Sequence, residues 1–275
     1  MMETMHRLRA RFDGSFNLIA YSYVGEAGCC INTAEHFHHC GKMEYTALKG
    51  DVRPTADGGL IMCHDAGFTI SEDGYVVKYD KDSSNTRWIR DMTTAECLAL
   101  VHRGKGGNRV TDFDTYIRIC KRYGKIAYIT IRDEYMEDAV PAMFAVLDKY
   151  HMREHCIVNS FAVESLEAVR AVDAEITLSH VLQGRKLPSR EDIDEADRLG
   201  NCQVCAFLFP FTDYVEDVNG DGVADGFDAL ELSREALNYA REKDIRIYCA
   251  ISTDFSQIDR LMRYGVMGVH MQAEP

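Results

Sequence analysis

Residues 51–65, DVRPTADGGLIMCHD, place a carboxylate and an imidazole where they could do acid–base chemistry. A predicted strand ends on Asp51, a polar turn follows, and a short apolar strand at 60–63 leads to His64 and Asp65. In α/β proteins the groups that bind ligands collect at strand ends. We therefore expect Asp51 and His64 to share one site, with His64 as its general acid or base.

The elements that position these residues alternate between short apolar runs and longer segments of helical periodicity. Several of the apolar runs are continuous, which is typical of strands covered on both faces. The predicted strands are 17–21, 47–52, 126–131, 156–159, 176–179, 203–209, 246–250 and 267–270, and the predicted helices are 33–40, 112–123, 137–150, 162–172, 190–199, 233–243 and 255–264. This alternation, with eight strands, predicts an α/β fold, a (β/α)8 TIM barrel.

The chain shows no internal repeat and no linker rich in Pro, Gly or Ser, so we expect one barrel domain over residues 1–275. Residues 66–94 interrupt the alternation, because they are rich in Asp, Ser, Gly and Tyr. This segment, after the second strand, is predicted to be an excursion from the C-terminal face of the barrel.

Charge and composition argue against several classes of partner. The formal net charge of −13 disfavours nucleic acid and anionic membranes, because both need a basic surface. No stretch approaches the roughly 18–20 apolar residues of a membrane span, and the N-terminus lacks the apolar segment of a signal peptide. No pattern in the sequence indicates an oligomeric state.

The 10 cysteines lie mostly in apolar runs, as buried free thiols do. A chain of 275 residues does not need disulfides, so a reducing, cytoplasmic setting is expected. Cys202 and Cys205 have the spacing of a redox motif, but they run into a predicted strand and not into a helix, which favours core packing.

The opening segment resembles the signature of the glycerophosphodiester phosphodiesterase family. The resemblance extends along most of the chain, through Asn32-Thr33 before Asp51, Asp57-Gly58, His64-Asp65, Ser160-Phe161 and the closing segment 264–269. It implies a (β/α)8 barrel and a role in lipid metabolism. It also implies phosphodiester cleavage by a divalent metal on three carboxylates, with two histidines as acid and base.

The positions that the resemblance assigns to this chemistry are mostly replaced. Tyr21 stands where the first histidine is expected, Lys49 replaces one metal carboxylate and Thr130 replaces another. Asp51 and His64 remain. A lone Asp cannot hold Ca²⁺ or Mg²⁺ in a site that needs several oxygens, so a catalytic divalent metal is not expected.

The remaining side chains predict a positive site in an acidic protein. We expect Tyr21, Lys49, Asp51 and Arg132 to bind a small anionic or phosphorylated ligand at the C-terminal face, in a non-catalytic or repurposed protein. The alternative is an active phosphoric diester hydrolase with an altered site around His64. A third possibility is a scaffold whose charges pair internally, Lys49 with Asp51 and Arg132 with Asp133 or Glu134.

Two neighbouring groups have weaker claims to function. The histidines at 36, 38 and 39 could form a metal cluster, although packing or surface roles are favoured. Cys29 and Cys30, in the predicted first loop over the barrel mouth, could pair with His64 as a nucleophile, but nothing in their spacing is specific for this.

Residues 217–228, DVNGDGVADGFD, match a calcium-loop pattern. The expected oxygen donors are the side chains of Asp217, Asn219, Asp221, Asp225 and Asp228 and the carbonyl of Val223. Gly222 is expected to provide the sharp turn. The approach is strand-like and an exit helix is expected from Ala229, so the loop would be isolated and not part of a helix pair. The alternative is a polar turn without metal.

Overall fold

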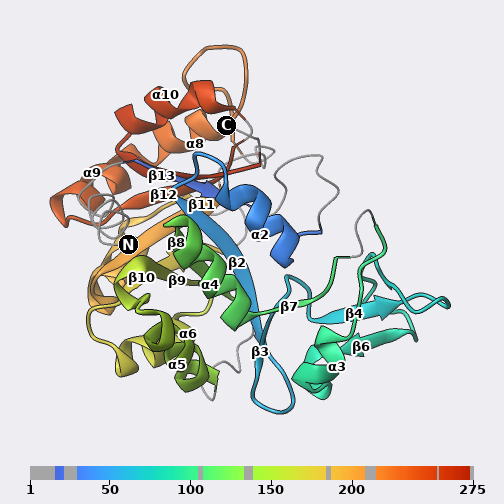
Figure 1. Cartoon of the computed structure of the whole chain (residues 1–275). Coiled ribbons are helices and arrows are strands. Elements are labelled where there is room, and N and C mark those ends of the chain that lie inside the picture. Colours follow the sequence, from blue (N-terminus) through green and yellow to red (C-terminus); the bar gives the residue numbers. More distant parts are fainter. Residues whose placement is uncertain are drawn as a thin grey trace.

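Eight parallel strands close into a barrel in the order of the chain, which confirms the predicted (β/α)8 fold (Figure 1). The computed structural model describes residues 16–21, 30–104, 108–132, 139–183, 187–207, 215–252 and 254–272. β1 (Asn17–Ala20) pairs with both β13 (Val266–Met271) and β2 (Ala47–Pro54), and this closes the ring. The strands between them are β8 (Ile126–Ile131), β9 (Cys156–Ser160), β10 (Thr177–Val181), β11 (Cys202–Phe207) and β12 (Ile247–Ser252).

The helices cover the outside of the barrel. They are α2 (Ala34–Gly41), α4 (Phe113–Tyr123), α5 (Val140–Tyr150), α6 (Val163–Val172), α7 (Arg190–Leu199), α8 (Gly226–Leu232), α9 (Arg234–Glu242) and α10 (Ile258–Arg263), with the 3-10 turns η3 (Arg153–His155) and η4 (Phe255–Gln257). Their ends follow local chemistry: Asp112 accepts a hydrogen bond from the Thr115 amide at 2.8 Å, and Gly124 ends α4 with a φ of 63°. Residues 137 and 138 of the predicted helix 137–150, and residues 208 and 209 of the predicted strand 203–209, lie outside the described residues.

Strand alternation divides the apolar residues into an inner and an outer layer. On β8, Ile126 and Tyr128 point into the barrel, while Ala127 and Ile129 pack under the helices. All four are buried, which explains why β8 is a continuous apolar run. No helix in the described residues is long and apolar enough to span a membrane.

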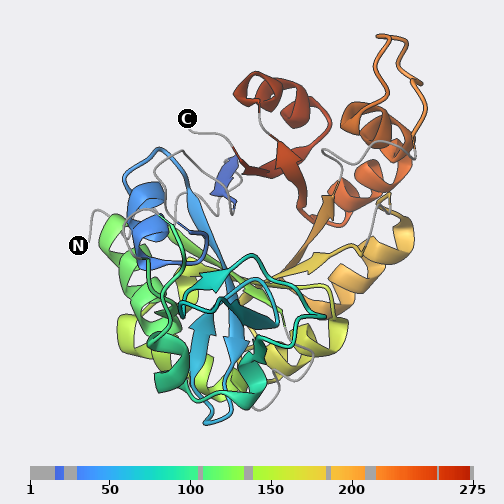
Figure 2. The ribbon, with the colours of Figure 1, turned by 90° about the vertical axis from the view of Figure 1, so that its right-hand side faces the viewer.

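The excursion is larger than predicted and has its own small core. It comprises β3 (Leu60–Met62), β4 (Gly67–Ile70), β5 (Val76–Val77), β6 (Thr86–Trp88), η1 (Ile89–Asp91), α3 (Thr94–Leu98) and β7 (Thr111–Asp112). β4, β5 and β6 form a separate three-stranded sheet. Phe68, Val76 and Ile89 lie in one buried cluster with Cys97. The excursion lies in front of the barrel in Figure 2.

One predicted boundary was wrong in a way that affects the site. β2 does not end on Asp51 but continues to Pro54, because Val52 to Pro54 pair antiparallel with Leu60 to Met62. The turn is held by Asp57, which accepts hydrogen bonds from the Thr55 hydroxyl at 2.7 Å and the Thr94 amide at 2.9 Å. The Asp-Gly turn therefore fastens the hairpin to α3.

Candidate functional site

Asp51 is the centre of a buried charge cluster inside the barrel. Its Oδ1 lies 2.6 Å from Lys49 Nζ and 2.7 Å from Arg132 Nε. Its Oδ2 accepts a hydrogen bond from Asn32 Nδ2 at 3.0 Å, and its backbone amide donates to Asn32 Oδ1 at 2.9 Å. The Asp51 side chain is 1% exposed, so these contacts are made away from bulk water.

The positions of these four residues on neighbouring elements explain why they meet. Lys49 and Asp51 are two apart on β2, so both face the barrel interior. Arg132 follows the end of β8, the neighbouring strand, in which Thr130 is opposite Asp51. Asn32 has a φ of 60°, a conformation that Asn tolerates better than most residues, directly before the start of α2.

The electrostatics of the cluster favour a charged Asp51. Burial alone would raise the pKa of the Asp51 carboxyl, but the Lys49 ammonium and the Arg132 guanidinium hold it well below its usual range. Burial lowers the pKa of Lys49, against the opposing effect of Asp51. Two cations therefore face one carboxylate, and the cluster carries a positive surplus.

The residues present do not fit a catalytic divalent metal at this position. Lys49 and Arg132 both contact the same Asp51 oxygen. Thr130 offers no carboxylate, and its hydroxyl accepts a hydrogen bond from Asn159 Nδ2 at 2.7 Å. In the described part of the chain, no three His, Cys, Asp or Glu side chains are arranged to hold a metal ion. The Lys49 ammonium supplies positive charge beside Asp51, where the resemblance implied a metal.

The other two predicted site residues border this cluster. The Tyr21 ring lies 5.0 Å from Lys49 Nζ, a cation–π contact. His64 Nδ1 lies 2.9 Å from Asp65 Oδ1, and the His64 carbonyl accepts a hydrogen bond from Arg53 Nη2 at 2.9 Å. His64 is therefore held at both its ring and its backbone.

A cavity of about 530 Å³ opens at the C-terminal ends of the strands, between the barrel and the excursion. It is lined by Arg53, Ala66, Trp88, Arg90, Ile131, Arg132, Ser160, Phe161, Ala162 and Gln183. These lining residues include three arginines and no acidic side chain. Arg132 thus belongs to both the cavity wall and the Asp51 cluster.

The sequence interpretation identified Arg132 but missed Arg53, Trp88 and Arg90. Arg53 follows Lys49 and Asp51 on the inward-facing positions of β2, so the period of two could have found it once β2 was extended to Pro54. Trp88 and Arg90 belong to the excursion, whose placement over the barrel no local pattern predicted. Lys49 and Asp51 are not lining residues; they are buried and connect to the cavity through Arg132.

Among the described residues, the neighbouring histidines and cysteines do not form a second metal-binding or nucleophilic site. His36 is buried beside Cys40, with Nε2 3.4 Å from the thiol sulfur, and burial lowers the pKa of His36 to about 4. His38 Nδ1 lies 3.2 Å from the Tyr123 hydroxyl. Cys29 lies outside the described residues, as do Asp133 and Glu134. The described cysteines form no disulfide bond with one another.

Cys202 and Cys205 are both buried on β11, as core packing predicts. Burial raises the pKa of each thiol to about 12. Neither thiol is therefore available as a thiolate for redox chemistry.

The calcium-like loop extends away from the barrel between β11 and α8, in orange in Figure 2. Gly222 makes the expected turn with a φ of 87°. Asp217 accepts hydrogen bonds from the amides of Gly220 at 2.7 Å and Gly222 at 2.9 Å. Asp228 accepts from three amides, those of Val218, Asn219 and Asp225. The side-chain oxygens therefore shape the loop, and calcium there stays a prediction.

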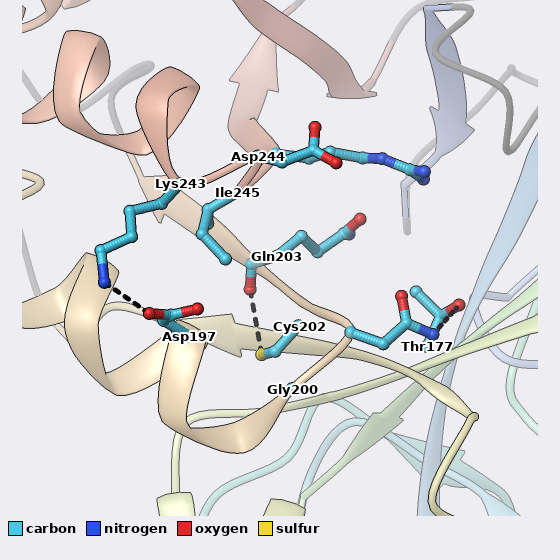
Figure 3. A pocket seen from close by; sticks show the side chains of 10 residues that line it. Thr177, Asp197, Gly200, Cys202, Gln203, Lys243, Asp244 and Ile245 are labelled. Carbon is cyan, nitrogen blue, oxygen red and sulfur yellow. Dashed lines mark hydrogen bonds and ion pairs between the residues drawn. The ribbon is translucent and has the colours of Figure 1, made fainter.

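A second cavity, of about 250 Å³, lies at the N-terminal ends of β10 to β12 (Figure 3). Lys243 and Asp197 form an ion pair of 2.6 Å at its edge. Its other charged residues are Asp244 and Arg246, so acids and bases balance.

The comparisons with known proteins find glycerophosphodiester phosphodiesterases in both sequence and structure. A curated glycerophosphodiester phosphodiesterase from Bacillus subtilis is 22% identical over 269 residues, which cover 91% of this chain and 80% of that protein. No protein-family model matches the chain. The resemblance to glycerophosphodiester phosphodiesterases is therefore confirmed by a curated relative, at 22% identity.

Solved structures share the fold. A putative glycerophosphoryl diester phosphodiesterase from Silicibacter pomeroyi has a TM-score of 0.71 and 15% identity, and covers 96% of this chain and 94% of its own. An Oleispira antarctica phosphodiesterase, solved with the product sn-glycerol-3-phosphate, has a TM-score of 0.68 and 14% identity, with 95% of each chain covered. These likenesses establish the barrel architecture.

Proposed function

We propose that this protein is a non-catalytic or repurposed glycerophosphodiester phosphodiesterase-like barrel that binds a small phosphorylated ligand at its C-terminal face. The observation that carries the proposal is the division of the cations. Lys49 and Arg132 both contact Asp51, the carboxylate that remains of the implied metal positions. Arg53, Arg90 and Arg132 line a cavity whose described lining includes no acidic side chain.

The chemistry of arginine supports a phosphate ligand. A guanidinium presents a planar set of donors that matches phosphate oxygens, and such charge-assisted hydrogen bonds are stronger than neutral ones. The solved Oleispira antarctica relative holds sn-glycerol-3-phosphate, so a glycerol-phosphate-like ligand is the first candidate. A role in lipid metabolism follows if that ligand is correct.

The test is calorimetric titration of the purified protein with sn-glycerol 3-phosphate. We expect saturable binding that the Arg132→Gln variant weakens by roughly 10- to 100-fold, because one charge-assisted contact is worth about 1.5–3 kcal/mol. Arg198→Gln is the matched control, since Arg198 is exposed on α7 and forms ion pairs with Glu167 and Glu195. Absence of binding by the wild type would overturn the proposal.

A second candidate, an active phosphoric diester hydrolase, is favoured by one contact. Asp65 lies within hydrogen-bond distance of His64 Nδ1, an arrangement that fixes the tautomer of a general acid or base. We would test hydrolysis of glycerophosphocholine with and without divalent metal, using His64→Ala as the control. Turnover that His64→Ala abolishes would establish this function instead.

For the loop at 217–228 we propose a calcium ion as a structural ligand, independent of the arginine cavity. The support is the match to the calcium-loop pattern together with the positive φ at Gly222. Calcium should raise the melting temperature of the wild type but not of Asp217→Asn. A wild-type melting temperature that calcium leaves unchanged would refute this assignment.

A further inference from the structure

The C-terminal cavity is larger, and has more cationic side chains in its wall, than one phosphate group requires. Its volume of about 530 Å³ lies in the range of sites for drug-sized ligands, about 300–1,000 Å³. Its arginines come from two separate parts of the chain. Arg53 lies on barrel strand β2 and Arg132 directly follows β8, whereas Arg90 lies in η1 of the excursion.

The excursion holds Arg90 in a defined place. The preceding residue, Ile89, is 2% exposed in the excursion core, and its amide donates to the Ala66 carbonyl at 3.1 Å. Trp88 is paired with Gly67 across the β4–β6 ladder. A Cβ on Gly67 would lie 2.7 Å from the Arg87 carbonyl oxygen, so the ladder needs glycine there. Arg90 therefore extends from an ordered anchor.

An aromatic ring lies beside a guanidinium on both the barrel side and the excursion side of the cavity. Phe161 lies under the Arg132 guanidinium at 5.7 Å, and Trp88 lies 5.9 Å from the Arg90 guanidinium carbon. Both rings line the cavity. Each arginine thus has an aromatic ring beside it in the cavity wall, and such a lining suits a ligand with a carbon body and more than one anionic end.

We infer that the cavity takes a ligand with two separated anionic groups, one phosphate at Arg53 and Arg132 and a second phosphate or carboxylate at Arg90. This inference rests on the proposed phosphate-binding function and extends it to the class of ligand. It also assigns a function to the excursion, because Arg90 binds the second anionic group while Arg53 and Arg132 of the barrel bind the first.

The experiment compares fructose 1,6-bisphosphate, fructose 6-phosphate and sn-glycerol 3-phosphate by calorimetry at 0.15 M salt, where long-range charge effects are screened beyond about 8 Å. We expect the bisphosphate to bind about tenfold or more tightly than either monophosphate, as one added charge-assisted contact predicts. Arg90→Gln should remove this gain and weaken binding of the bisphosphate by more than it weakens binding of either monophosphate. Arg87→Gln, an exposed arginine on β6 that does not line the cavity, is the matched control.

The outcomes separate the two claims. Monophosphate binding without a gain for the bisphosphate, or a gain that survives Arg90→Gln, would overturn the two-anion inference and leave the proposed function intact. Failure of all three ligands to bind would overturn both. A gain that depends on Arg90 and not on Arg87 supports the inference.

Discussion

The two ends of the barrel both carry basic side chains around a cavity, but only one end has a surplus of positive charge. At the N-terminal end, Lys243 and Arg246 share their cavity with Asp197 and Asp244 (Figure 3). At the C-terminal end, the described residues that line the cavity include three arginines and no acid. The two ends therefore differ in charge balance and not in the presence of charge, and the unbalanced C-terminal end is the one at which we propose binding. The C-terminal end is also where (β/α)8 barrels build their sites.

The largest effect should come from unbalancing the buried cluster. Asp51→Asn leaves the Lys49 ammonium and the Arg132 guanidinium without their buried counter-charge. Breaking a buried ion pair in this way costs about 3–5 kcal/mol. Urea unfolding should show this loss in the free energy of unfolding, and a loss no larger than that of an exposed surface variant would contradict the cluster geometry.

Acidification should reveal a second difference between buried and exposed groups. Burial lowers the pKa of His270 to about 3 and that of His36 to about 4. Below the unfolded-state pKa of about 6.5, the unfolded chain binds protons that the folded chain does not. The free energy of unfolding therefore decreases as the pH is lowered, until the pH reaches the folded-state pKa. Between pH 7 and pH 5 each histidine should cost on the order of 2 kcal/mol.

Chemical denaturation at the two pH values measures this loss. His270→Gln should reduce the pH dependence. His151→Gln removes an exposed histidine and should leave it unchanged. An identical pH dependence in wild type and His270→Gln would show that His270 is not a buried neutral imidazole.

A third contrast concerns one arginine at each end. Arg53→Gln should weaken binding of sn-glycerol 3-phosphate by about tenfold, because it removes a cavity guanidinium and the donor to the His64 carbonyl. Arg246→Gln, in the charge-balanced cavity, should leave the affinity unchanged. Equal effects of the two substitutions would break the distinction between the ends.

The smallest effect is expected at the N-terminal edge. Asp197→Asn removes the nearer carboxylate partner of Lys243, but the two side chains are 45% and 35% exposed, and an ion pair in contact with water contributes little. The urea midpoint should stay within experimental error of wild type. A clear loss of stability would show that the balanced end depends on its charges as much as the C-terminal end does.

The sequence predicted the barrel well because β8, β9 and β11 are buried on both faces and therefore appear as unbroken apolar runs. The pairing of Lys49 with Asp51 was expected only in the scaffold alternative, and it follows from a spacing of two on one strand. The described partner of Arg132 is Asp51 across the β2–β8 ladder, whereas the sequence interpretation proposed Asp133 or Glu134.

The contribution of the excursion could not be predicted from sequence. Trp88 and Arg90 reach the cavity only because β2 continues past Asp51 and the hairpin carries β4, β6 and η1 over the barrel mouth. Asn32 presents a similar case, since its bonds to Asp51 depend on a left-handed backbone conformation between separate elements. Both depend on tertiary placement that no periodicity encodes.

The central claim is that protein cations, and not a divalent metal, organise the anion site around Asp51. Calorimetric titration with sn-glycerol 3-phosphate in EDTA, and again with excess Mg²⁺ or Ca²⁺, tests it directly. We predict the same dissociation constant in all three conditions. Binding that appears only when a divalent metal is added would contradict the claim.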